Sequence, residues 1–311
     1  MSSADSPSPD IPSTARAART ALAAAQPAVV RIGRAPGRGC GIVVAAGRVL
    51  TNAHNLRDRT TEVAFADGRT EQGRIAGVDP DGDLVVLEVD TGDTPAVAWA
   101  GEAAEPGEVV FAVGRSADGG ARITYGMVSG AERSFRGPRG RRITGSLEHT
   151  APLARGSSGS PLVDASGRLL GINTARLADG FYLAIPADPD LRARVDALVR
   201  GESIHRLVLG VGLAPADVAR QLRASVGLAD REGLLVRSVS PDSPAERAGV
   251  KTGDLITKAD GHDVATVDDL HTALDVARGG RHLALHVVRG ADELDLTVDF
   301  DETTTDADPE A

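Results

Sequence analysis

Short apolar runs separated by turn-forming residues fill the chain between residues 28 and 185. The runs are AVVRI, GIVVA, RVLTNAH, TEVAFADG, LVVLEV, VVFAVG, ITYGMVSG, SPLVDASG, LLGINTA and FYLAI. Runs of this length and composition are typical of β-strands, and many of them in succession are typical of a barrel or a sandwich. We therefore predict that residues 28–200 form a β-barrel domain.

The pattern changes to helical spacing near residue 188 and becomes mixed beyond residue 206. Leu191, Val195 and Leu198 recur at the spacing of one helix face, and Gly201 follows as a stop signal. Farther on, strand-like runs surround a stretch with helical spacing, VDDLHTALDVARG. The barrel domain should therefore close with a helix, and a small α/β domain should follow over residues 206–300.

The two ends of the chain lack the signals of a packed core. We expect residues 1–27 to be a disordered start followed by a short helix, and residues 301–311 to be an acidic disordered tail. The sequence shows neither a signal peptide nor an apolar segment long enough to span a membrane. We therefore expect a cytoplasmic location, with export by an unrecognised route as the alternative.

Composition adds constraints to this picture. The chain of 311 residues is 41% hydrophobic and 25% charged, which is typical of a globular protein with a buried core. Its formal net charge of -10 argues against a nucleic-acid partner, and we expect the basic run between residues 133 and 142 to be a solvated loop. Cys40 is the only cysteine, so an intramolecular disulfide is excluded and a buried structural thiol is expected.

The segment LARGSSGSPLVD, which contains Ser158, raises the question of a nucleophile. Small polar residues of this kind usually form turns, and a serine hydroxyl attacks only when a base accepts its proton. His54 lies where the chain turns after an apolar run, and Asp83 stands at the head of the run LVVLEV. A buried carboxylate at Asp83 could fix the tautomer of His54, which would activate Ser158. We expect the nearby Asp79 and Asp81 to be solvated turn residues.

Chain order separates the possible hydrolase folds. The candidates run His54, Asp83, Ser158, which is the order of the chymotrypsin arrangement, whereas α/β-hydrolases run serine, acid, histidine. An α/β-hydrolase would also need glycine where Ser160 stands, and the pattern lacks the alternating helices of a doubly wound sheet. For the other histidines a surface or structural role is the default expectation, including His149 on the strand that approaches Ser158.

Five segments together resemble the HtrA/Deg branch of the trypsin-like serine proteases. VLTNAHNL resembles its histidine motif, DGDLVVLEVD its aspartate motif and GSSGSPLVD its nucleophile motif, and GINTA and FYLAIP follow in the family's order. The resemblance implies a mainly β, two-barrel chymotrypsin-like domain with His54 as general base, Asp83 as its orienting acid and Ser158 as nucleophile. It also implies an oxyanion hole made by the backbone N–H groups of Gly156 and Ser158, and it implies no cofactor.

Two positions depart from the family's pattern. Ser157 replaces asparagine before the nucleophile, and Ser160 replaces the second glycine after it. Neither change removes a triad atom, and an oxyanion hole of backbone N–H groups tolerates changes of side chain. We expect Gly156 to matter most, because a Cβ there would obstruct the inward turn of its peptide.

Residues 206–300 resemble a PDZ domain of the circularly permuted bacterial type. SPAERAGVKTGDLITKADGHDV matches the structural part of that pattern, with Asp254 in a turn, and RLVLGV matches the carboxylate-binding loop. The resemblance implies that Leu209, Gly210 and Val211 capture the C-terminal carboxylate of a peptide that adds as a strand. A PDZ fold that only packs against the barrels is the alternative.

The leading hypothesis is a serine endopeptidase that cleaves unfolded or flexible polypeptides, with PDZ binding of C-terminal peptides for regulation or substrate capture. The alternative is a catalytically decayed adaptor or chaperone. APLARGS and FYLAIP carry no acid suited to hold Lys or Arg, so we expect cleavage after small or medium aliphatic residues. His282 and His286 share a strand face without a third ligand, so no metal site is expected. The resemblance also raises a homotrimer as a possible assembly.

Overall fold

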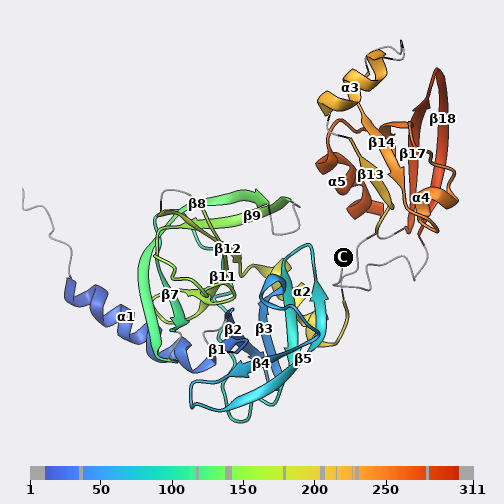
Figure 1. The fold of residues 1–311 in the computed structure, drawn as a ribbon. Coiled ribbons are helices and arrows are strands. Elements are labelled where there is room, and N and C mark those ends of the chain that lie inside the picture. Colours follow the sequence, from blue (N-terminus) through green and yellow to red (C-terminus); the bar gives the residue numbers. More distant parts are fainter. Residues whose placement is uncertain are drawn as a thin grey trace, which may run out of the picture. The chain divides into compact units, whose positions relative to one another are not determined.

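The computed structural model describes residues 11–34, 38–116, 119–136, 142–177, 180–203, 207–214, 216–225, 227, 231–277 and 280–300. The chain forms two compact units that divide between residues 204 and 205 (Figure 1). The first unit carries the candidate catalytic residues, and the second carries the candidate peptide-binding loop.

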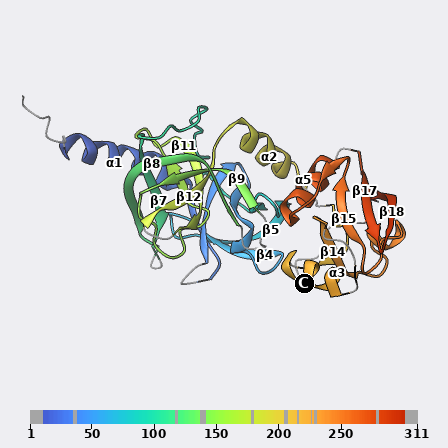
Figure 2. The same cartoon turned by 90° about the horizontal axis from the view of Figure 1, so that it is seen from above.

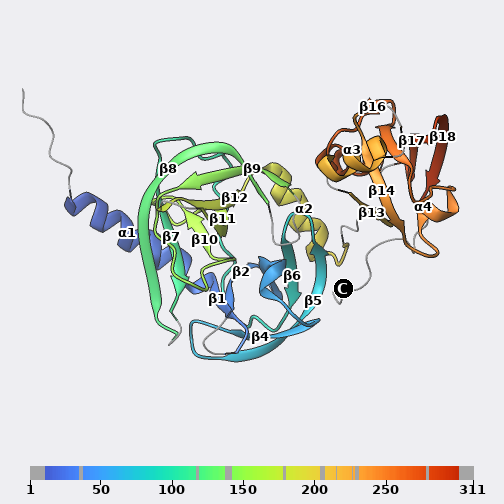
Figure 3. The same ribbon diagram turned by 45° about the horizontal axis from the view of Figure 1, so that its top comes forward.

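The first unit contains two closed β-barrels (Figure 3). The first barrel comprises β1 (Val29–Ile32), β2 (Gly39–Ala45), β3 (Arg48–Asn52), β4 (Thr60–Ala64), β5 (Thr70–Asp79) and β6 (Leu84–Glu88), in the order β1-β2-β3-β6-β5-β4. The second comprises β7 (Val109–Arg115), β8 (Ala121–Arg136), β9 (Arg142–His149), β10 (Pro161–Val163), β11 (Leu169–Arg176) and β12 (Tyr182–Pro186), in the order β10-β11-β12-β9-β8-β7. The predicted two-barrel, mainly β fold is confirmed.

A shared hydrophobic core holds the two barrels together. One continuous cluster of buried side chains includes Ile42 and Leu50 from the first barrel and Leu169 and Ile172 from the second. Interiors packed in this way resist relative movement of their elements. The loops of one barrel are therefore fixed relative to the loops of the other, and the candidate triad draws on both.

Helices flank the barrels. α1 (Ile11–Ala25) and the 3₁₀ helix η1 (Gln26–Ala28) precede β1, and α1 packs against strands of the second barrel. α2 (Pro189–Val199), which lies on the opposite side of the barrels from α1 in Figure 2, packs on β5 and β6. The Asp188 side chain caps it by accepting a hydrogen bond from the Leu191 N–H at 2.7 Å. The predicted closing helix is thus confirmed. No helix in the described ranges is long and apolar enough to cross a membrane.

Two barrel strands lie outside the apolar runs that the sequence shows. β5 contains Gly73, Arg74 and Gly77, and β9 contains Gly145 and Glu148, so neither forms an apolar run. Each is bound on both sides by neighbouring strands of its barrel, β5 by β4 and β6, and β9 by β8 and β12. The backbone groups of those neighbours must be paired for the barrel to close, and this requirement overrides the weak local pattern.

The basic run between residues 133 and 142 is largely part of a strand pair. Three of its arginines lie on β8 or β9, namely Arg133, Arg136 and Arg142. Arg133 Nε lies 3.3 Å from a carboxylate oxygen of Glu148. The prediction of a solvated loop is wrong for these positions, because β8 and β9 stay paired as far as Arg136 and Arg142. Arg139 and Arg141 lie outside the described residues.

The second unit is an α/β domain built on one antiparallel sheet. Its strands are β13 (Val211–Leu213), β14 (Leu234–Val239), β15 (Leu255–Ala259), β16 (His262–Asp263), β17 (His282–Arg289) and β18 (Asp292–Asp299), and its helices are α3 (Ala216–Ser225), α4 (Pro244–Arg247) and α5 (Val267–Ala277). The order β13-β14-β15-β17-β18 places β13 at one edge. The helix expected from VDDLHTALDVARG is confirmed as α5, whereas the sequence pattern did not indicate α3.

Asp254 does more than form the predicted turn before β15. Its side chain is fully buried and accepts hydrogen bonds from Arg289 Nε at 2.7 Å and Arg289 Nη2 at 2.8 Å. It also accepts one from the Lys251 N–H at 2.8 Å. This paired contact ties the turn to β17, since a guanidinium and a carboxylate match in geometry as well as in charge.

Candidate active site

Strand pairing brings His54 and Asp83 together. β3 and β6 are neighbours, with Asn52 opposite Leu84. His54 follows β3 on the 3₁₀ helix η2 (Ala53–Asn55), and Asp83 directly precedes β6. His54 Nδ1 lies 2.7 Å from Asp83 Oδ2, and the backbone N–H of His54 donates to Asp83 Oδ1 at 3.1 Å. The carboxylate therefore fixes both the position and the orientation of the imidazole ring.

Asp83 is buried and held in an unusual backbone conformation. Its φ is 55°, which lies in the left-handed region that residues other than glycine seldom adopt. Its backbone carbonyl accepts hydrogen bonds from the Ala53 N–H and the Asn52 side chain, both at 3.0 Å. Its Oδ2 also accepts a hydrogen bond from Thr174 Oγ1 of β11 at 3.0 Å. The carboxylate is thus bonded from both barrels.

Asp79 is not the solvated turn residue that the sequence suggests. Asp79 is 3% exposed, accepts a hydrogen bond from the Gly82 N–H at 2.9 Å and lies 3.3 Å from Arg194 Nη1. Asp81 is half-buried. The expectation is wrong for Asp79, because Arg194 of α2 supplies a cationic partner for it. That turn is consequently fixed just before Asp83.

Ser158 is attached to both halves of the site. Its backbone carbonyl accepts hydrogen bonds from the Cys40 N–H at 2.8 Å and from Asn55 Nδ2 at 2.9 Å. Its hydroxyl donates to the carbonyl of Thr174 at 3.1 Å. Among the hydrogen bonds of the described residues, none joins Ser158 Oγ directly to His54. The structure therefore brings the three candidates to one site, with the hydroxyl turned toward β11.

The serine loop, residues 156–160, has backbone N–H groups of two kinds: some donate a hydrogen bond within the protein and others do not. Three of them donate to carbonyl groups at 2.7 to 3.3 Å, those of Ser157, Gly159 and Ser160. Within the described part of the chain, the N–H groups of Gly156 and Ser158 donate to no acceptor. The family resemblance assigns these same two N–H groups to the oxyanion hole.

The glycines of this loop are required for different reasons. Gly156 has φ 81°, but a Cβ there would meet no atom within 4 Å. The expected obstruction is therefore wrong, and the need for glycine is conformational. Gly159 has φ 84°, and a Cβ there would lie 2.1 Å from the Cys40 carbonyl oxygen. No local signal in the sequence indicates that Gly159 approaches the first barrel so closely.

Cys40 is the buried structural thiol that the sequence predicts. It is 1% exposed, and burial raises the pKa of its thiol above the usual range. Its Sγ lies 3.4 Å from the Gly156 carbonyl oxygen. With its N–H bonded to Ser158, Cys40 contacts the serine loop at two points.

A buried histidine lies behind the serine loop. His149 of β9 is fully buried, its Nε2 lies 2.9 Å from Asn173 Oδ1, and its ring stacks on Tyr182. Asn173 in turn donates from Nδ2 to the hydroxyl of Ser160 at 3.0 Å. Burial lowers the pKa of His149 to about 4. The ring is therefore neutral near pH 7, and it supports the loop through Asn173, a structural role consistent with the default expectation.

The loop predicted to bind a peptide terminus leads into the edge strand β13. The Gly210 carbonyl accepts a hydrogen bond from the Ser240 N–H at 2.8 Å, and Val211 stands opposite Val239. In an antiparallel ladder this combination makes Val211 and Val239 a non-hydrogen-bonded pair. The N–H and C=O groups of Val211 therefore point away from β14, toward the free edge. Leu209, by contrast, is 4% exposed and belongs to the core.

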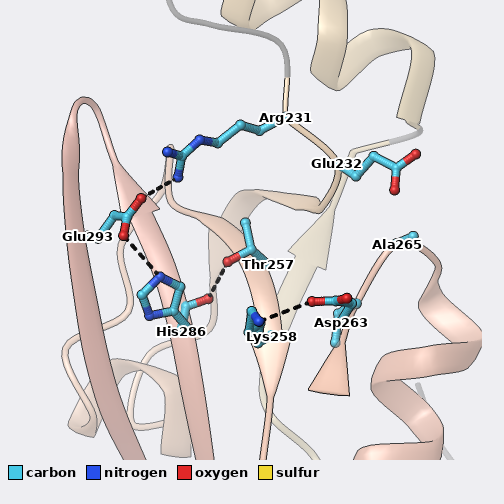
Figure 4. A pocket seen from close by; sticks show the side chains of 9 residues that line it. Arg231, Glu232, Thr257, Lys258, Asp263, Ala265, His286 and Glu293 are labelled. Carbon is cyan, nitrogen blue, oxygen red and sulfur yellow. Dashed lines mark hydrogen bonds and ion pairs between the residues drawn. The ribbon is translucent and has the colours of Figure 1, made fainter. Parts of the chain in front are cut away.

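A hollow on the second unit, shown in Figure 4, is lined largely by charged residues, and most of these are already paired. Arg231 contacts Glu293 at 2.6 Å, and Lys258 contacts Asp263 at 3.3 Å. His286 lies 3.6 Å from Glu293. The described residues contain no cluster of three or more His, Cys, Asp or Glu side chains that could hold a metal ion. We assign no function to this hollow.

Comparison with known proteins agrees with this geometry. The trypsin-like peptidase domain family matches residues 39–172, and the PDZ domain family matches residues 208–300. A protein of Synechocystis sp. named serine protease HhoA is 32% identical over 280 residues, which cover 85% of this chain and 71% of HhoA. The chain belongs to the HtrA/DegP family of trypsin-like serine proteases. Both the resemblance stated from the sequence and the C-terminal PDZ domain are confirmed.

Two further comparisons give the extent of the likeness to this HtrA-family chain. Serine protease HhoB of Synechocystis sp. is 32% identical over 270 residues, covering 83% of this chain and 64% of HhoB. This chain thus spans less than two thirds of the length of HhoB. A solved structure of the HtrA-type protease AlgW with a decapeptide has a TM-score of 0.69 and 26% identity, covering 90% of this chain and 97% of that one.

Sequence reasoning missed several contributors to the HtrA-type site. Thr174 and Asn173 lie in GINTA, a segment that matches the family, but no role was attached to either residue. Asn55 stands beside His54 in the histidine segment. The position of His149 behind the loop had no local signal, because it depends on the pairing of β9 with β12.

We predict that His149 makes the free energy of unfolding fall as the pH is lowered from about 6.5 to about 4. Above this window the ring is neutral in both states; within it, the unfolded chain binds a proton that the folded chain does not. The stability lost by the lower limit is on the order of 3 kcal/mol. Urea denaturation at several pH values, followed by the fluorescence of Trp99, measures the effect.

The matched variants are His149→Gln and His262→Gln, the latter at an exposed histidine of the second unit. His149→Gln should show a weaker dependence of stability on pH than the wild type, and His262→Gln should keep the wild-type dependence. Equal dependence in the wild type and His149→Gln would contradict the prediction.

Proposed function

We propose that this chain is a serine endopeptidase in which Ser158 is the nucleophile, His54 the general base and Asp83 the residue that orients the base. The observation that carries the proposal is the 2.7 Å contact between His54 Nδ1 and Asp83 Oδ2. A carboxylate in this position holds the Nδ1 proton, leaves Nε2 as the proton acceptor and stabilises the imidazolium that forms during reaction.

The reaction begins with a rotation of the Ser158 hydroxyl. Because Oγ donates to the Thr174 carbonyl, attack requires it to turn toward His54 Nε2. Oγ then attacks the substrate carbonyl carbon while Nε2 takes its proton, and the N–H groups of Gly156 and Ser158 bind the oxyanion. His54 gives the proton to the leaving amine, and water activated by the same ring hydrolyses the acyl-enzyme. This chemistry requires no cofactor.

The free edge of β11 supports a polypeptide substrate. β10 pairs with β11 as far as Ile172, and Thr174 to Arg176 continue beyond that point with β12 on their other side. An extended peptide can add to such an edge through main-chain hydrogen bonds. Unfolded and flexible chains offer extended segments, so we propose these as substrates, cleaved after small or medium aliphatic residues.

A decayed adaptor or chaperone is the alternative function. The strained conformation of Asp83, at φ 55°, favours the protease. Backbone strain of this kind persists where the surrounding structure enforces it and clusters at functional sites. A chain that only bound peptides would not need a buried carboxylate held against a histidine.

We further propose that the PDZ domain binds the C-terminus of a peptide along β13, for regulation or substrate capture. Val211 presents its N–H and C=O groups at the free edge, as its register with Val239 requires. In the described part of the chain, the N–H groups of Leu209 and Gly210 donate to no acceptor. Neighbouring N–H groups of this kind can capture a carboxylate. The AlgW structure with a decapeptide supports peptide binding in a protein of this family.

We predict that a fluorophosphonate probe labels the chain at Ser158. Only this hydroxyl can turn toward His54 while its own N–H and that of Gly156 meet the developing oxyanion. Ser158→Ala should abolish labelling and lower turnover of unfolded casein roughly a million-fold. Mass spectrometry of the labelled peptide identifies the serine.

Ser157 and Ser160 provide controls within the same loop. The hydroxyl of Ser160 is buried and accepts a hydrogen bond from Asn173, so we do not expect it to act as the nucleophile. Ser157→Ala and Ser160→Ala should each lose much less activity than Ser158→Ala. Labelling should be measured alone and with unfolded casein and an apolar C-terminal peptide present. Absence of Ser158-dependent labelling under every condition would reject the protease and leave the adaptor.

We predict that amidating the C-terminus of an apolar peptide weakens its binding to the PDZ domain by about tenfold or more, since a hydrogen-bonded charge is lost. Titration calorimetry with the full-length Ser158→Ala chain measures both affinities without cleavage of the peptide. Equal affinities for the free-acid and amidated peptides would show that the loop containing Gly210 does not bind a carboxylate.

A further inference from the structure

The guanidinium group of Arg176 is held in place at the edge of the candidate site. Arg176 is the last residue of β11 and is exposed to solvent. Its Nη2 donates a hydrogen bond to the Leu153 carbonyl, and its Cζ lies 5.4 Å from the centre of the Tyr182 ring. A cation over an aromatic face is attracted to it. These two contacts fix the side chain before any substrate is present.

The position of Arg176 relative to the nucleophile follows from the chain. Thr174, two residues earlier, accepts the hydrogen bond of the Ser158 hydroxyl. Two residues of extended chain span about 7 Å, and an arginine side chain reaches as far again. Leu153, which binds the guanidinium, opens the segment that leads to Ser158. The Arg176 side chain therefore links the end of β11 to the segment that leads to Ser158.

Two more exposed arginines stand close to Ser158 on other segments. Arg155 directly precedes Gly156, and Arg38 lies two residues before Cys40, whose N–H donates to the Ser158 carbonyl at 2.8 Å. The ion pairs between described residues include none of the three arginines. Three exposed arginines without an ion-pair partner among the described residues thus lie on segments that adjoin Ser158, although the chain has a formal net charge of -10.

We infer that the polypeptides cleaved at Ser158 carry acidic side chains within about three residues of the scissile bond, and that Arg176 is the residue that selects them. This inference rests on the proposed endopeptidase function. A guanidinium presents several N–H groups in one plane that match a carboxylate, and only Nη2 is engaged by Leu153. A substrate with Lys or Arg at the same position would be repelled.

The acidic preference adds to the aliphatic preference at the cleaved position. The residue before the scissile bond reaches the segments beside Ser158, whereas Arg176 lies two residues farther along the β11 edge from Thr174. A peptide strand added antiparallel to that edge places its third residue before the bond near Arg176. The two preferences therefore concern different residues of the substrate.

The test uses the full chain and three internally quenched peptides. The peptides share one sequence with an aliphatic residue before the scissile bond and differ only in Glu, Gln or Lys two residues farther upstream. The wild type should cleave the Glu peptide with a kcat/KM about tenfold above that for the Gln peptide, and the Lys peptide should be poorest. High salt should shrink these ratios, because the contact is exposed.

Variants assign the preference to Arg176. Arg176→Gln should bring the Glu and Gln peptides to nearly equal kcat/KM, and Arg176→Glu should favour the Lys peptide. Reversal of preference requires a folded, active chain, so it cannot arise from misfolding. Arg19→Gln, at an exposed arginine of α1 remote in the chain, is the matched control and should keep the wild-type order.

The failures of the two proposals are distinguishable. Equal cleavage of the three peptides by a wild type that is labelled at Ser158 would overturn the inference and leave the protease standing. A Glu preference that survives in Arg176→Gln would overturn the role of Arg176. A wild type that is neither labelled at Ser158 nor cleaves any peptide would overturn the proposed function, and the inference with it.

Discussion

The carboxylate of Asp83 is the group on which the site depends. It is buried, and it accepts hydrogen bonds from His54 of the first barrel and from Thr174 of the second. A buried carboxylate is tolerated only when its oxygens are hydrogen-bonded. The packing of the two barrels and the orientation of the candidate base are therefore linked through this carboxylate, since moving one barrel relative to the other would break its hydrogen bond with Thr174.

The serine loop is bound to the first barrel in the same way. Its Ser158 carbonyl accepts hydrogen bonds from Cys40 and Asn55, and Gly159 approaches Cys40 so closely that only glycine fits. The loop is consequently arranged before a substrate binds, which allows its unengaged N–H groups to stabilise developing charge without reorganisation. Serine is accommodated at residue 160 because its hydroxyl accepts a hydrogen bond from Asn173.

Motifs and short runs in the sequence were enough to predict the barrels and the PDZ domain and to nominate the candidate triad, because each has a signal within one short segment of the chain. What they missed depends on partners far away in the chain. Asp79 resembles a turn residue, and its burial follows from Arg194, 115 residues later. β5 and β9 form because they pair the backbone N–H and C=O groups of neighbouring strands. The position of the Arg176 side chain depends on its hydrogen bond to the carbonyl of Leu153. Such pairings become visible only once the fold is known.

The most direct test of this account is the tautomer of His54 near neutral pH. Nitrogen NMR of the full chain with isotopically labelled histidine reports which ring nitrogen carries the proton, and the His54→Gln variant assigns the signal. The account predicts a proton on Nδ1, directed at Asp83, with Nε2 unprotonated, and a change of tautomer in Asp83→Asn. A wild-type His54 with its proton on Nε2 would contradict it.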